Sequence, residues 1–134
     1  MSGRAVEAFL PMVPPRVTHN ALEVHRVGGR ATIGKSADLR EAEAALGARV
    51  AKVAPDVPLS GPLRLQVRVC WPCGGRHGQG EPMCDKPDWD NFAKTFQDVL
   101  ARCHVIRDDK DVVDARVAKA WADPAGIWFR VEEL

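Results

Sequence analysis

Residues 63–71, LRLQVRVCW, alternate between two kinds of side chain without interruption. Large apolar residues occupy every second position from Leu63 to Trp71, which is the period of a β-strand. A strand with this pattern packs one face against a core and leaves the other in water. The chain therefore needs an apolar layer that covers one side of a sheet.

Two segments have the helical periodicity that such a layer requires. The first runs from a potential N-cap at Ser36 to Pro55, and the second follows Pro87 and runs to Cys103. Each predicts an amphipathic helix with a continuous apolar stripe. The stripes consist of Leu39, Ala42, Leu46, Val50 and Val53 in the first helix, and of Phe92, Phe96, Val99, Leu100 and Cys103 in the second.

The remaining strand-like segments complete the expected fold. They are residues 5–10, a hairpin that turns at Gly28–Gly29, residues 112–121 and residues 126–134. With 134 residues, of which 46% are hydrophobic, the chain is long enough for a core of its own. We expect an α+β fold, a small mixed sheet with two main helices packed against it, in a single domain over residues 1–134.

Composition says more about the cellular compartment of the protein than about its function. No apolar run approaches the roughly 20 residues that span a bilayer, and the N-terminus lacks the apolar region of a signal peptide. We therefore expect a cytoplasmic protein. Its four cysteines are expected to be thiols, and not a disulfide framework. Cys70, Cys73 and Cys84 border a Gly- and Pro-rich loop, but only one C-x₂-C pair is present, so we do not expect structural zinc there.

Two acidic clusters are the most informative feature for function. Asp88 and Asp90 stand at the start of the second helix, and Asp108, Asp109 and Asp111 precede the strand at 112–121. A helix followed by a strand can bring the clusters together, where the carboxylates repel one another unless a cation lies among them. Two interpretations stay open. The acids form a Mg²⁺ site with oxygen ligands, or they cap the helix and are otherwise solvated.

The same stretches resemble a known family. The run KPDWDNFAK, the following Asp98 and the run VIRDDKDVV resemble the RusA family of Holliday junction endonucleases. The Pro-rich LPMVPPRVTHN and the AKAWADPAGIWF ending are similar to that family as well, so the resemblance covers nearly the whole chain. Its specific part is the Asp-x-Asp-Asn motif with the later aspartate pair.

The resemblance implies which residues act. Asp88, Asp90 and Asp109 map onto the family's metal-binding and catalytic aspartates, and Lys94 onto its essential lysine. It implies Mg²⁺ as the cofactor, with Mn²⁺ able to substitute, and 5′-phosphate and 3′-hydroxyl products. Without the resemblance, Lys94 is equally a surface partner of an acid one helical turn away. Asp108 is expected beside the metal ligands, and Asp111 at the plain surface.

The implied substrate is a four-way junction or other branched DNA. Arg16 and Lys86 are candidate contacts to its phosphates, and Lys119 matches a lysine in the family's late strand. Symmetric cutting of two strands implies a homodimer, encoded by a bacterium or a phage. Two alternatives stay open: a nuclease for flaps or forks, and a DNA-binding module of the same fold that does not cleave.

Overall fold

A five-stranded mixed sheet forms the body of the protein. The structure is a computed structural model, and it describes residues 3–18 and 22–134. The strands are β1 (Ala5–Pro11), β4 (Leu63–Trp71), β5 (Glu81–Pro82), β6 (Val112–Trp121) and β7 (Gly126–Glu133). Their order is β1-β7-β4-β6-β5, in which β4 and β6 are parallel and the other pairs antiparallel. The expected α+β fold with a mixed sheet is confirmed.

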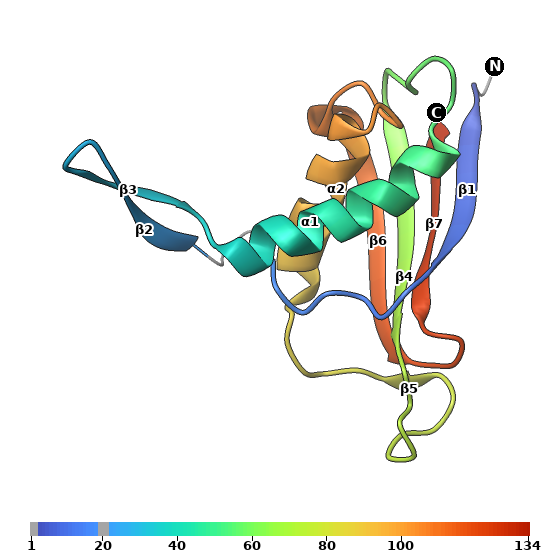
Figure 1. The fold of residues 1–134 in the computed structure, drawn as a ribbon. Helices are drawn as coiled ribbons and strands as arrows, with labels where there is room; N and C mark the ends of the chain where they lie inside the picture. The colour runs from blue at the N-terminus through green and yellow to red at the C-terminus, as the bar shows by residue number, and fades with distance from the viewer. Residues whose placement is uncertain (1–2, 19–21) are drawn as a thin grey trace.

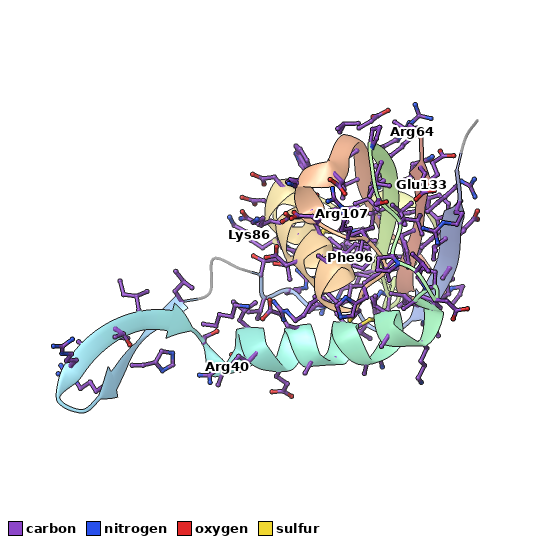
Figure 2. The ribbon with its side chains drawn as sticks, turned by 90° about the horizontal axis from the view of Figure 1, so that it is seen from above. Arg40, Arg64, Lys86, Phe96, Arg107 and Glu133 are labelled. Atoms are coloured by element: carbon purple, nitrogen blue, oxygen red, sulfur yellow. The ribbon has the colours of Figure 1, made fainter. Side chains whose placement is uncertain are left out.

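Two helices cover one face of this sheet. They are α1 (Ala37–Val50), extended by the 3₁₀ turn η1 (Ala51–Val53), and α2 (Trp89–Arg102). The alternating residues of β4 that face the helices are buried, as the sequence predicts, whereas Arg64 and Arg68 on the opposite face are exposed. Figure 2 shows Arg64 on the side of the sheet away from α1. Neither of the helices described, each 14 residues long, could cross a membrane.

Aromatic rings join α2 to the sheet. Phe96 lies edge-on to Phe129 of β7 with ring centroids 5.4 Å apart, and Phe92 lies edge-on to Trp71 of β4 at 6.4 Å. Phe92 and Phe96 also stack on each other. Because all four rings are almost fully buried, they set the height and orientation of α2 over the sheet, and with them the place of its acidic N-terminus.

A separate hairpin projects from the body. Strands β2 (Leu22–Val27) and β3 (Arg30–Lys35) pair antiparallel and point away from the sheet (Figure 1). The turn is at Gly28 and Gly29, as predicted, and both have the positive φ that a two-residue hairpin turn requires. At the base of the hairpin, Lys35 donates to both carboxylate oxygens of Glu43 in α1, at 2.9 and 3.1 Å.

Candidate active site

Asp88 and Asp90 lie at the exposed start of α2. Asp88 is the N-cap residue by backbone geometry, and its carbonyl accepts the first helical hydrogen bond from Phe92 N. Its carboxylate makes no capping bond, so the capping interpretation is wrong for that side chain. It lies instead 3.2 Å from Lys86 Nζ. Within the described part of the chain, the carboxylate of Asp90 has no hydrogen bond or ion pair.

The second acidic cluster is built around the short 3₁₀ turn η2 (Asp109–Asp111) before β6. Its three aspartates have different surroundings. Asp108 caps η2 by accepting from Lys110 N at 3.0 Å, and this bond holds its pKa below the usual value. Asp111 is buried, contrary to the expected surface position, because Arg107 donates to both of its oxygens at 2.9–3.2 Å. Asp109 is left facing α2.

Lys94 connects η2 to α2. Its Nζ lies 3.4 Å from Asp109 Oδ2 and 3.6 Å from Asp98 Oδ1. The charge of Asp98, and then the hydrogen bond and charge of Asp109, raise the pKa of Lys94. The amine is therefore a cation at neutral pH and cannot serve there as a general base. The two acids that contact this amine are Asp98, one helical turn further along α2, and Asp109 of the second acidic cluster.

The three predicted metal ligands do not form a closed cage. Among residues 3–18 and 22–134, no three carboxylate, imidazole or thiolate side chains meet closely enough to hold a metal ion. The donor set nonetheless fits a hard divalent cation, because Asp88, Asp90 and Asp109 are carboxylates and none of them accepts a described backbone N–H. Asp88 and Asp109 each contact a lysine amine, so both carboxylates already attract a cation in the free protein.

The three predicted DNA contacts are arranged around the residues that precede Asp88. Lys86 is exposed, with 80% of its side chain in solvent (Figure 2). Arg16 Nη1 donates to Lys86 O at 2.9 Å. Lys119 Nζ donates to Asp85 O and to Pro87 O, both at 2.7 Å. Arg16 and Lys119 therefore contact this loop backbone directly.

An open cleft lies beside Asp88. It has a volume of about 370 Å³ and runs between the Arg16–Val17–Thr18 segment and residues 86–88, with Asn91 at its edge. The sequence carries the Pro-rich segment that forms one wall, but no local pattern predicts that residues about 70 positions apart meet here. The Arg107–Asp111 pair is the other feature that sequence reasoning missed, although its i,i+4 spacing is a usable signal.

None of the cysteines lines this cleft, and all four are free thiols. Cys70 is buried in β4, Cys73 is buried with its thiol 3.8 Å from Gln79 Oε1, and Cys84 is exposed. In the loop between β4 and α2, Gln79 contacts Asp123 twice: Gln79 Nε2 donates to Asp123 O, and Asp123 N donates to Gln79 Oε1.

Comparison with known proteins gives one finding. The family model described as "Endodeoxyribonuclease RusA" matches residues 12–132, which include most of the Pro-rich segment, both acidic clusters and the strands and helices from β2 to β7 except the last residue of β7. No curated protein matches the chain.

Proposed function

We propose that this chain, which belongs to the RusA family of endodeoxyribonucleases, resolves Holliday junctions by paired, symmetric nicks that depend on a divalent metal ion. The observation that carries the proposal is the contact of Lys94 with Asp109, because it joins α2, the helix that begins with Asp88 and Asp90, to the second acidic cluster. Such an enzyme acts in DNA recombination and repair, in the cytoplasm of a bacterium or of a phage-infected cell.

Asp88, Asp90 and Asp109 would hold the metal ion, Mg²⁺ or Mn²⁺. A bound ion of this kind supplies a more acidic water and a Lewis acid for the scissile phosphate. In the free protein, the Lys86 and Lys94 amines partly neutralise Asp88 and Asp109, which limits the repulsion among the acids. Binding a cation therefore requires these lysines to turn toward the phosphate that arrives with the DNA.

Lys94 is suited to stabilise the reacting phosphate. The reaction adds water to phosphorus and breaks the bond to O3′, which leaves with a proton and gives a 5′-phosphate and a 3′-hydroxyl. Negative charge builds on the phosphate oxygens as the water attacks. The neighbouring acids keep Lys94 protonated, so its amine can donate to those oxygens throughout the working pH range.

Symmetric cutting requires two such sites, which a twofold homodimer would supply. The projecting hairpin supports this part of the proposal. Val24 and Ile33 are directly opposite each other in the β2–β3 register, and they are 63% and 75% exposed. Two large apolar side chains exposed on one face of a hairpin are suited to contact a second copy of the chain.

Substrate choice tests the proposal. The wild-type protein, a four-way junction, a replication fork and a linear duplex of matched sequence are incubated with Mg²⁺, and products are resolved on denaturing and native gels. We expect symmetric nicks in opposite arms of the junction and little cleavage of the duplex. Asp90→Asn is the matched inactive control. Preferential cutting of the fork, or equal cutting of the duplex, would contradict junction resolution.

A further inference from the structure

Three consecutive backbone carbonyls precede Asp88, and all three accept hydrogen bonds from cationic side chains. Lys119 Nζ binds the first and third, Asp85 O and Pro87 O, at 2.7 Å each. Arg16 Nη1 binds the second, Lys86 O, at 2.9 Å. The donors come from β6 and from the segment after β1, so three distant parts of the chain meet at these residues.

Both cations are held by their own surroundings. The Arg16 guanidinium lies over two indole rings, 5.9 Å from the Trp71 centroid and 5.6 Å from that of Trp121. Trp71 Nε1 in turn donates to Pro14 O at 3.0 Å, which ties the segment that carries Arg16 to β4. The Trp121 ring is itself stacked on the His77 ring, with centroids 4.0 Å apart.

Lys119 is fixed by the sheet. It stands opposite Val69 in the parallel β4–β6 register, half-buried on the helix-covered side, and its carbonyl accepts from Met83 N at 3.2 Å. Two of its three amine donors are used by Asp85 O and Pro87 O. Because its amine binds these two carbonyls, Lys119 is poorly placed to contact a DNA phosphate at the surface.

We infer that Arg16 and Lys119 are positioning residues that fix residues 85–87 and thereby aim the Asp88 carboxylate into the cleft. The inference rests on the proposed nuclease function and assigns a different role from the phosphate contacts expected from sequence. A charge-assisted hydrogen bond to each carbonyl restricts the backbone directly before the helix. A displacement of about 1 Å at a reacting group can cost on the order of 10²-fold in rate.

The alternative role, direct binding of DNA phosphates, has a distinct signature. Each phosphate contact that is lost lowers the slope of log affinity against log salt by about 0.9 for duplex DNA. Substitution of a positioning residue leaves that slope unchanged and lowers only the cleavage rate after binding. The exposed Lys86 is the matched comparison, because it is the predicted phosphate contact on the same loop.

The experiment uses the full chain with Lys119→Met, Arg16→Met and Lys86→Met. Junction affinity is measured at several salt concentrations in Ca²⁺, and single-turnover cleavage is measured in Mg²⁺. We expect Lys119→Met and Arg16→Met to lose ~10- to 100-fold in rate with the wild-type salt slope. Lys86→Met should lower the slope by about 0.9. A lower slope for Lys119→Met or Arg16→Met, with a rate that recovers at saturating protein, would overturn the inference.

Two further measurements keep the test independent of folding and of nuclease activity. Lys119→Arg retains a cation with several donors, so it should recover part of the rate that Lys119→Met loses. Amide hydrogen exchange in a peptide covering residues 84–91 should be faster in Lys119→Met than in the wild type, while exchange in β4 is unchanged. Unchanged exchange in residues 84–91 would overturn the inference, and an inactive wild type would contradict only the proposed function.

Discussion

Lys94 joins α2 to the second acidic cluster. Its amine lies within 3.6 Å of Asp98 on its own helix and of Asp109 on η2. The other two aspartates of the second cluster have different partners: Asp108 caps η2, and Asp111 binds Arg107. Local geometry therefore separates three aspartates that look equivalent in the run RDDKD, and it leaves Asp109 as the one that faces α2.

Single Asp→Asn changes should separate catalysis from binding. We expect Asp88→Asn, Asp90→Asn and Asp109→Asn each to abolish cleavage, because each removes a carboxylate charge from the proposed metal site. The fold and junction affinity should be retained, since these side chains are not part of the core. Single-turnover cleavage and a gel-shift assay in Ca²⁺ measure the two effects.

The control for this series is Asp108→Asn. Asparagine is as good an N-cap as aspartate, so this variant should keep η2 and most of the activity. An inactive Asp108→Asn together with a fully active Asp109→Asn would show that the assignment within the pair is reversed.

Lys94→Met should affect the rate far more than the stability. The amine is half-exposed, so loss of its ion pairs should cost no more than about 1 kcal/mol in the free energy of unfolding. Loss of a donor to the developing phosphate charge should cost ~10²-fold in single-turnover rate at saturating protein. Urea denaturation and rapid-quench cleavage provide the two values, and a near-wild-type rate would make Lys94 a surface ion-pair residue only.

At the scale of elements, α1 joins the hairpin to the body through one buried acid. Glu43 has only 5% of its side chain exposed, and it binds Lys35 of β3 and lies 3.6 Å from Arg102 of α2. The sequence pattern places this glutamate between apolar stripe positions and predicts nothing about its burial. Its partners come from β3 and α2, which no local pattern connects.

Glu43→Ala should therefore loosen the hairpin at its base. Lys35 and Arg102 remain about half-exposed and can be hydrated, so we expect a loss of about 1–3 kcal/mol in the free energy of unfolding. Trypsin should cut faster at Arg26 and Arg30 in the hairpin. Glu41→Ala, at an exposed position of the same helix, is the control, and equal digestion rates of the two variants would contradict this role.

Elements were predicted well where one local pattern determines them. The alternation in β4 and the stripes of α1 and α2 each reflect burial of a single face, so their bounds follow from sequence. The parallel pairing of β4 with β6, and the place of β1 at the edge beside β7, depend on contacts between distant segments. For the same reason the roles of the aspartates and Lys94 are predicted only through a family resemblance, and the Lys119 and Arg16 contacts to residues 85–87 were not predicted at all.

At the scale of the whole molecule, Glu133 ties the two ends of the described chain together. Its carboxylate accepts from Arg4 N at 2.9 Å and from Ser60 N at 3.0 Å. These backbone hydrogen bonds, that of Arg4 first, lower the pKa of Glu133 below its ordinary value of 4.5. A carboxyl group with a lower pKa in the folded state stabilises the fold above the unfolded pKa, and this contribution is lost as pH falls.

Glu133→Gln should consequently change the pH dependence of stability. We expect the variant to be less stable than the wild type at pH 7, and the difference to shrink as pH falls from about 4.5, the ordinary pKa, through the lower pKa of the folded wild type. Chemical denaturation between pH 3 and pH 7 measures it, with Glu41→Gln as the control for loss of charge. A difference that stays constant with pH would show that the carboxylate charge is not the cause.

Metal-dependent cleavage of a four-way junction by the wild-type protein is the most direct test of the central claim. One preparation is given the same junction in Mg²⁺, in Mn²⁺, in Ca²⁺ and in EDTA, and the nicked products are followed in single turnover. The proposed metal site of Asp88, Asp90 and Asp109, with Lys94 beside it, predicts 5′-phosphate products in Mg²⁺ and Mn²⁺, binding without cleavage in Ca²⁺, and no cleavage in EDTA. Nicking at the full rate in EDTA would contradict it.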